Sequence, residues 1–215
     1  MEKYAGILRY MGHSGSFDKN LEMLISSSLE RLDGVCDPRY VKKHLSCTVT
    51  EDRVTINMLK IESRGLAARL INCTHVYIFA ATLGAAVDRL ITQRTKIDSA
   101  EALCLQACAA ARLEDYCDSI EKEILDELKN RHLHLRPRFS PGYCDFNIAH
   151  QTDVLLILQA HKFIGVTETK AHMLTPLKSV TALVGIGPGE AAAIVDRCFS
   201  CGNRDCQFYE KRFEQ

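Results

Sequence analysis

Apolar residues recur at helical spacing along two stretches of the chain. The first stretch follows Asp18 and ends at Gly34, with leucines and isoleucines three or four residues apart. The second runs from Asp98 to Asn130 and is the longest regular pattern, and Asp98 and Glu101 have the spacing of an N-cap and its reciprocal partner. The spacing predicts an amphipathic helix at each stretch.

A strand pattern follows the first predicted helix. Residues 44–49 and 53–59 are rich in β-branched side chains and are separated by only three residues, which predicts a hairpin. Val54, Ile56 and Met58 alternate with polar neighbours. We therefore expect these three side chains on the buried face of the hairpin.

Two further stretches have the pattern of strands in the interior of a sheet. Residues 74–81 are almost all apolar, as in a central strand, and residues 178–187 alternate before they become apolar. Shorter helices are expected at 63–71, 85–94, 147–163 and 191–197. Together the patterns predict an α+β fold with a mainly antiparallel twisted sheet packed with helices, in an order of strands that the patterns leave open.

Length, charge and apolar content limit the domain organisation, the partners and the location that we expect for this chain. A chain of 215 residues can form one sizeable domain, which we expect at residues 1–197, followed by a cysteine-rich tail at 198–215. The 27 basic and 27 acidic residues balance and form no long run, which argues against a nucleic-acid or anionic-membrane partner. The N-terminus lacks the pattern of a secretory signal and no stretch is apolar enough for a membrane span, so we expect a cytoplasmic protein.

Residues 136–145 follow no periodicity and contain two prolines and a glycine. This composition predicts a loop whose amides and carbonyls point outward to hold a ligand. Arg138 offers a fork of donors that suits a carboxylate, Gly142 permits close backbone approach, and Tyr143 supplies a flat apolar face. The alternative interpretation is an ordinary surface loop.

The sequence from Arg138 to Tyr143 has the form Arg-x-x-Pro-Gly-Tyr. It resembles the S-adenosylmethionine-binding loop of the activation domain of cobalamin-dependent methionine synthase. The segment from Met173 to Thr181 resembles that family's Met, Pro and Ser-Val-Ser/Thr segment. The similarity extends over roughly residues 104–186, whereas the first hundred residues match more weakly. The resemblance implies an activation-domain-like α+β fold.

The resemblance also implies a binding site for S-adenosylmethionine. In that site Arg138 would pair with the carboxylate of the ligand, and the backbone around Ser140 and Gly142 would bond its polar edge. Tyr143 would pack on the ligand, and Glu114 would anchor its amino or ribose end. The resemblance assigns no catalytic side chain, because the cobalt of the cobalamin attacks the methyl group.

Three features of this site stay open at the level of sequence. Asp115 or Asp118 could take the place of Glu114, or all three could form a solvated acidic face. A tyrosine that the family supplies after its Ser-Val-Ser segment is absent from Leu183-Val-Gly185. The aspartate of the family's N-terminal arm has no clear match, so the affinity or the pose of the ligand could differ.

Ten cysteines are many for a cytoplasmic protein, because disulfides do not persist in a reducing compartment. Cys198, Cys201 and Cys206 have a spacing that suits one metal ion or cluster, either zinc or iron-sulfur. A fourth ligand could be an exogenous group or one of Cys144, His150 and His172. The alternative is three reduced cysteines in a tail, and the other cysteines are expected to pack as small apolar groups.

The resemblance implies a reactivation function in trans, because the chain has no recognisable cobalamin-binding or homocysteine-binding domain. The cobalamin would be carried by a separate methionine synthase or other corrinoid protein, and flavodoxin or ferredoxin would donate the electron. Whether the chain counts as an enzyme is open. The alternatives are a non-catalytic module that senses S-adenosylmethionine or assembles corrinoid proteins, and a metal-binding structural protein.

Overall fold

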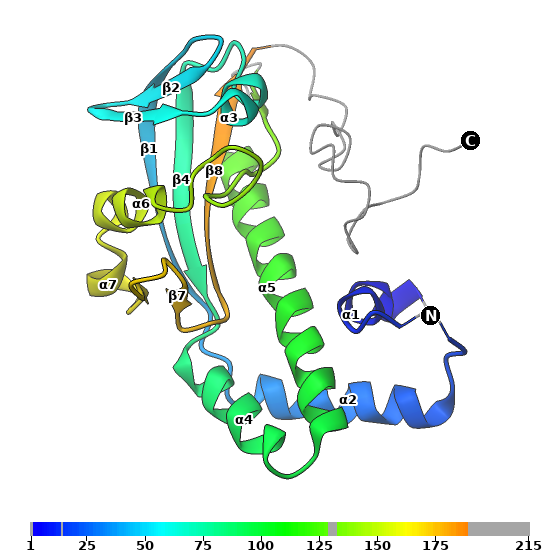
Figure 1. Ribbon diagram of the computed structural model, residues 1–215. Helices are drawn as coiled ribbons and strands as arrows, with labels where there is room; N and C mark the ends of the chain where they lie inside the picture. Colours follow the sequence, from blue (N-terminus) through cyan, green and yellow to red (C-terminus); the bar gives the residue numbers. More distant parts are fainter. Residues whose placement is uncertain (1, 14, 129–132, 189–215) are drawn as a thin grey trace.

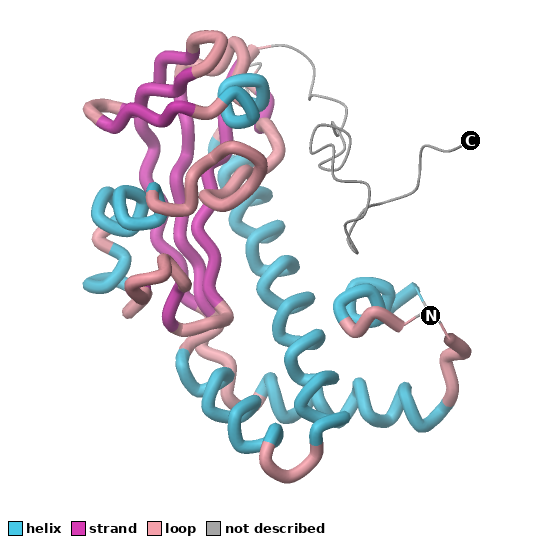
Figure 2. Tube along the Cα trace, viewed as in Figure 1, coloured by secondary structure: helices cyan, strands magenta, loops and turns pink. Residues whose placement is uncertain are grey.

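The computed structural model describes residues 2–13, 15–128 and 133–188 of the chain. At its centre lies a six-stranded antiparallel sheet in the order β3-β2-β1-β4-β8-β5 (Figures 1 and 2). A small separate sheet pairs β6 with β7. The strands are β1 (Arg39–Val49), β2 (Arg53–Ile56), β3 (Leu59–Glu62), β4 (His75–Thr82), β5 (His134–Leu135), β6 (Thr167–Glu168), β7 (Leu174–Thr175) and β8 (Ser179–Gly187).

Helices cover both faces of the large sheet (Figure 1). The long helix α5 (Ser99–Glu127) lies along one face, and α6 and α7 lie on the other. The remaining elements are η1 (Glu2–Tyr4), α1 (Ala5–Tyr10), α2 (Lys19–Asp33), α3 (Arg64–Arg69), α4 (Ala85–Thr95), α6 (His150–Leu158) and α7 (Ala160–Phe163). The structure confirms the predicted α+β class with a mainly antiparallel sheet.

The residues of the central strand β4 explain why helices pack on both faces of the sheet. Alternate residues of a strand point to opposite faces. Val76 and Ile78 join the core under α3 and α6, whereas Tyr77 and Phe79 join the core under α5. All four side chains are buried, which explains why this stretch is nearly continuous in apolar residues.

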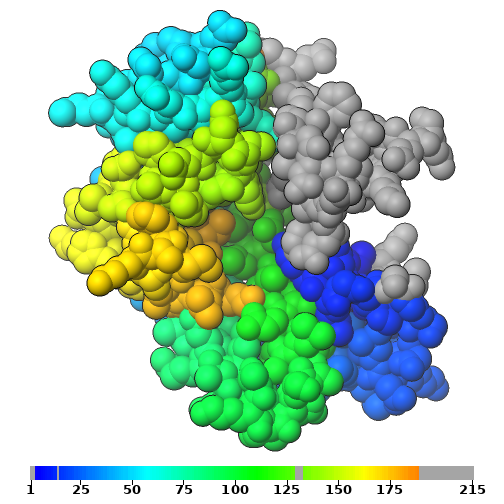
Figure 3. Space-filling view, viewed as in Figure 1, coloured from blue at the N-terminus to red at the C-terminus, as the bar shows by residue number. Residues whose placement is uncertain are grey.

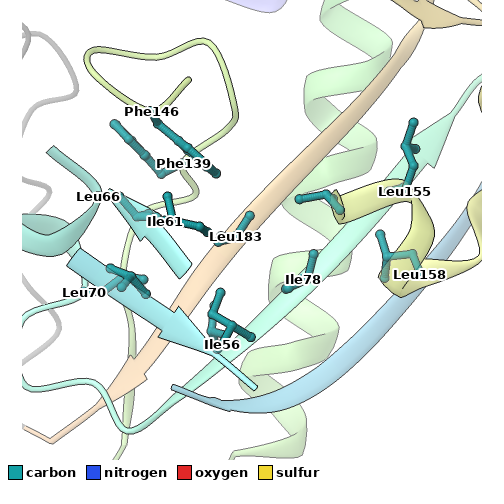
Figure 4. Close-up of a cluster of buried hydrophobic side chains, with 14 of the residues drawn as sticks. Ile56, Ile61, Leu66, Leu70, Ile78, Phe139, Phe146, Leu155, Leu158 and Leu183 are labelled. Atoms are coloured by element: carbon teal, nitrogen blue, oxygen red, sulfur yellow. The ribbon is translucent and has the colours of Figure 1, made fainter. Parts of the chain in front are cut away.

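The loop between β5 and α6 contributes directly to the first of these cores. Figure 4 shows its two phenylalanines beside the hairpin and α3. The side chains drawn there come from β2, β3, α3, β4, the loop, α6 and β8, and those labelled are Ile56, Ile61, Leu66, Leu70, Ile78, Phe139, Phe146, Leu155, Leu158 and Leu183. This packing fixes the base of the loop against the sheet.

A third core lies mainly between helices. The N-terminal half of α5 extends past the sheet and packs with α1, α2 and α4 (Figure 1). Asp18 accepts a 2.8 Å hydrogen bond from the Leu21 amide and begins α2, and Asp98 accepts from the Ala100 and Glu101 amides and begins α5. The structure thus confirms the two helices predicted from the apolar periodicity.

Two details of the prediction are wrong. Met58 is 94% exposed rather than buried, because the chain turns at Asn57, whose φ is 53°, and returns as β3. The helix predicted over 147–163 is divided into α6 and α7 by Gln159, which adopts a left-handed conformation with φ 51°. The helix predicted over 191–197 and the domain boundary after residue 197 lie outside the described residues.

Within the described ranges, no helix combines the length and the apolar character that a membrane span needs.

Candidate functional site

The β5–α6 loop (residues 136–149) begins as an extension of the sheet. The Arg136 amide donates to the Gly185 carbonyl, and Phe139 and Leu183 exchange two backbone hydrogen bonds of 2.9 Å. Phe139 is buried, and its ring stacks on the Phe146 ring at a centroid distance of 6.2 Å. The first half of the loop is therefore tied to β8 before the chain leaves the sheet.

Beyond Phe139 the loop closes on itself. The Gly142 amide donates to the Phe146 carbonyl at 2.7 Å, the Tyr143 amide to Ser140 at 3.2 Å, and the Phe146 amide to Tyr143 at 2.9 Å. Gly142 has a φ of 92°, and a Cβ at this position would lie 3.1 Å from the Ile148 side chain. The expectation that the loop directs its polar backbone outward is therefore wrong for these groups, which stabilise the loop.

Asp145 anchors the far side of the loop to the start of α3. Its carboxylate accepts hydrogen bonds from the Ser63 hydroxyl at 2.6 Å and from the Arg64 and Gly65 amides at 2.7 Å and 3.0 Å. Burial alone would raise the pKa of Asp145, but these hydrogen bonds outweigh it and lower the pKa below its ordinary value. Sequence reasoning placed Asp145 at the end of the loop without assigning it this role.

Arg138 lies between the loop and α5 and is bound by three carboxylates. Its guanidinium donates to Glu114 Oε2 at 2.5 Å, Asp118 Oδ1 at 2.6 Å and Glu121 Oε1 at 2.6 Å. The three acids are spaced four and three residues apart, which places them on one face of α5. We call these four residues the Arg138 cluster.

The positive and negative charges of the Arg138 cluster do not balance. The Arg138 side chain is only 7% exposed, and three carboxylates against one guanidinium give the cluster a formal charge of −2. Burial alone would lower the pKa of Arg138, but the charges and hydrogen bonds of Glu121 and Glu114 raise it above its ordinary value. Arg138 thus stays charged, and the cluster has an excess of negative charge that a cationic group could neutralise.

The structure brings together two site residues that lie far apart in the sequence, Arg138 and Glu114. Tyr143 lies at the exposed tip of the loop, with its ring edge-on to Phe139 at 5.9 Å. Ser140 is half-buried and Gly142 is exposed in the same loop. The ligand roles of these residues remain predictions. Of the two alternatives to Glu114, Asp118 also binds Arg138 and Asp115 is exposed.

Tyr10, at the end of α1, is a residue that sequence reasoning missed. It is half-buried, and its hydroxyl lies within electrostatic reach of Glu114 and Tyr143. Burial raises the pKa of Tyr10, and the charge of Glu114 raises it further. The surface is hollowed between the loop and α1, and α5 lies at the bottom of this hollow (Figure 3). Nothing in the sequence of α1 indicates that Tyr10 lies near Glu114.

The proposed metal ligands Cys198, Cys201 and Cys206 lie outside the described residues. Among the residues that the structure does describe, no three or more His, Cys, Asp or Glu side chains are grouped so that they could hold a metal ion. Cys144 is exposed on the loop. The other two residues considered as a fourth ligand have carboxylate neighbours, His150 with Asp153 at 2.9 Å and His172 with Glu168 at 3.0 Å.

Comparison with known proteins supports the fold. No protein-family model matches the chain, and no curated protein matches it. Among solved structures, the crystal structure of the MetH reactivation domain bound to AdoHcy is similar, with a TM-score of 0.65 and 15% sequence identity. The match covers 86% of this chain and 74% of that chain. At this identity the likeness shows a shared fold, and it confirms the resemblance to the methionine synthase activation domain that the loop motif indicates.

Proposed function

We propose that this chain binds S-adenosylmethionine and supports the reductive methylation of cob(II)alamin on a separate methionine synthase or other corrinoid protein. The observation that carries the proposal is the direct contact of Arg138 with Glu114, beside the Tyr143 loop. Both residues were predicted as ligand contacts, and they meet in a fold shared with a domain whose structure contains AdoHcy.

The charges of the Arg138 cluster suit this ligand. S-adenosylmethionine has a positive sulfonium, a positive ammonium and a negative carboxylate. A guanidinium has five N–H donors, of which three bond the carboxylates of α5. In the proposal the other two bind the ligand carboxylate, while Glu114, which is 35% exposed, faces the ammonium or the ribose.

The loop would complete the site with its backbone. The Gly142 amide and the Ser140 carbonyl are bonded within the loop. In the proposal the Ser140 amide and the Gly142 carbonyl therefore face the polar edge of the ligand, and Tyr143 packs on its apolar side. These groups would hold the methyl group in one orientation, so the contribution of the protein is positioning and electrostatics.

The proposed reaction takes place in the cytoplasm and needs two partners. One electron from flavodoxin or ferredoxin reduces the cobalamin of the corrinoid partner, and the methyl group of S-adenosylmethionine passes to cobalt, which leaves S-adenosylhomocysteine. An iron-sulfur cluster on Cys198, Cys201 and Cys206 would supply the electron from this chain itself, whereas zinc there would act as a structural clip. The absorption spectrum of anaerobically purified protein distinguishes these two metals.

A non-catalytic module that senses S-adenosylmethionine is the second candidate, and one observation favours it. The family tyrosine is replaced by Leu183-Val-Gly185, and Leu183 and Val184 point into the two cores of the sheet. Both side chains are fully buried, so neither can take the place of a tyrosine that contacts the ligand.

A methyl-transfer assay distinguishes the two candidates. The chain is incubated anaerobically with cob(II)alamin-loaded methionine synthase, a reducing system and methyl-labelled S-adenosylmethionine. We expect label on the corrinoid that depends on both the chain and the reductant, and that falls in a Glu114→Gln variant but not in an Asp115→Asn variant. Binding of S-adenosylmethionine without any transfer would instead support the sensing module.

A further inference from the structure

The first helix of the chain forms a wall of the candidate site. α1 packs against α5, and Ile7 and Leu8 are buried in the helical core beneath it. A Cβ built at Gly6 would lie 3.8 Å from Ala111 Cβ, so the two helices are close at this point. The small residue at position 6 allows α1 to lie directly against the α5 face that carries Glu114.

Helix geometry then places Tyr10 near Glu114. Tyr10 follows Gly6 by four residues and Glu114 follows Ala111 by three, so each pair lies on one face of its helix. The two faces meet where Gly6 contacts Ala111. The Tyr10 hydroxyl is consequently close enough to Glu114 and Tyr143 for their charges to influence its ionisation.

The chemistry of these three side chains suits an onium ion. Tyrosine rings attract cations through the negative face of the ring, and a carboxylate adds a full opposite charge. The guanidinium carbon of Arg9 lies 5.5 Å from the Tyr10 ring centre, so one face of this ring already accommodates a cation. The formal charge of −2 on the Arg138 cluster acts in the same direction.

We propose that Tyr10, together with Tyr143 and Glu114, recognises the positive sulfonium, so that the site binds S-adenosylmethionine more tightly than its demethylated product. This inference rests on the proposed function and adds a residue and a specificity to it. Loss of the methyl group converts the sulfonium to a neutral thioether, which removes the charge that these groups bind. The product should therefore dissociate from the site more readily than the substrate does.

Calorimetric titration with both compounds tests the inference. We expect the wild-type chain to bind S-adenosylmethionine about tenfold more tightly than S-adenosylhomocysteine. Tyr10→Leu, which removes the ring, should reduce this preference to about twofold by weakening the sulfonium compound alone. Tyr10→Phe, which keeps the ring and removes the hydroxyl, should retain most of the preference.

A matched control tyrosine, Tyr40, is available on β1. Tyr40 donates a hydrogen bond to Glu123 of α5 outside the candidate site, so Tyr40→Leu should leave the ratio of the two affinities unchanged. Equal weakening of both compounds in Tyr10→Leu would show that Tyr10 only supports the fold, and this result would overturn the inference. An unchanged ratio in Tyr10→Leu would also overturn it, without affecting the proposed function. Failure of the wild-type chain to bind S-adenosylmethionine would overturn both.

Discussion

Two charged clusters lie on the same helix, α5, and differ in how their charges balance. In the Lys42 cluster, Lys42 donates to Glu123 at 2.7 Å and to Glu127 at 2.6 Å. Tyr40 donates to both oxygens of Glu123, and Tyr77 donates to Glu127 at 2.7 Å. Two carboxylates thus receive one cation and two neutral hydroxyl donors, and the Lys42 cluster ties the C-terminal turns of α5 to β1 and β4.

The Arg138 cluster has one more carboxylate and a more deeply buried cation. The Arg138 side chain is 7% exposed, compared with 16% for Lys42, and its formal charge balance is −2 compared with −1. The Lys42 cluster joins a helix to a sheet, whereas the Arg138 cluster joins the helix to a glycine-containing loop. We therefore propose that the Lys42 cluster serves packing and that the Arg138 cluster serves ligand binding.

The largest expected effect comes from Arg138→Ala. This change leaves three carboxylates close together without their cation, so we expect the free energy of unfolding to fall by about 2 to 3 kcal/mol. Binding of S-adenosylmethionine should weaken by about 2 kcal/mol because a charge-assisted contact is lost. Denaturant titration and calorimetry measure the two effects. Unchanged affinity in a folded variant would refute the role assigned to Arg138.

Glu114→Gln should act on binding more than on stability. It removes one of three negative charges while an amide oxygen can still accept from Arg138, so we expect a loss of about 1.5 kcal/mol in ligand binding. Asp115→Asn is the matched control, because it removes an equal charge from the neighbouring exposed position. Equal losses in the two variants would mean that the general acidity of α5 matters, not the carboxylate at Arg138.

Lys42→Met should affect stability alone. Glu123 and Glu127 are substantially exposed, so solvent screens the two ion pairs and we expect a loss of about 1 kcal/mol. Binding of S-adenosylmethionine should not change, because the Lys42 cluster lies outside the candidate site. A loss of binding in this variant would remove the distinction between the two clusters.

The smallest effect concerns pH. Hydrogen bonds from Lys42 and Tyr40 lower the pKa of Glu123, and those from Lys42 and Tyr77 lower the pKa of Glu127. A carboxylate whose pKa is lowered by folding stabilises the protein above its unfolded pKa of about 4.3, and that contribution disappears as the pH falls through the folded pKa. The stability difference between wild type and Lys42→Met should therefore be constant near neutrality and shrink below about pH 4. A difference that persists in acid would contradict this assignment.

Much of the fold could be predicted from the periodicity of apolar residues, because the burial of one face of a helix or strand determines which of its positions are apolar. The 3.6-residue pattern of α2 and α5 and the continuous apolar run of β4 reflect which faces are covered. Periodicity does not show where a strand turns, so Met58 continued the pattern of β2 although the chain had already reversed at Asn57. The order of strands could not be predicted either, because β4 pairs with β8 although residues 83–178 lie between them in the chain.

The candidate site was predictable only in part. The loop motif indicated Arg138 and Tyr143, and the resemblance indicated Glu114. The carboxylates at positions 118 and 121 share a helix face with Glu114, but sequence does not show which cation this face meets. Tyr10 was not predicted, because its place depends on the packing of Gly6 against Ala111 across two helices.

The role proposed for the Arg138 cluster and its loop is to bind S-adenosylmethionine. The decisive experiment is calorimetric titration of the anaerobically purified wild-type chain with S-adenosylmethionine, with the Glu114→Gln and Asp115→Asn variants alongside. We expect one site per chain with a micromolar dissociation constant, and we expect Glu114→Gln to weaken binding and Asp115→Asn to leave it unchanged. A folded wild-type chain that releases no heat of binding and fails to retain the ligand in equilibrium dialysis would contradict it.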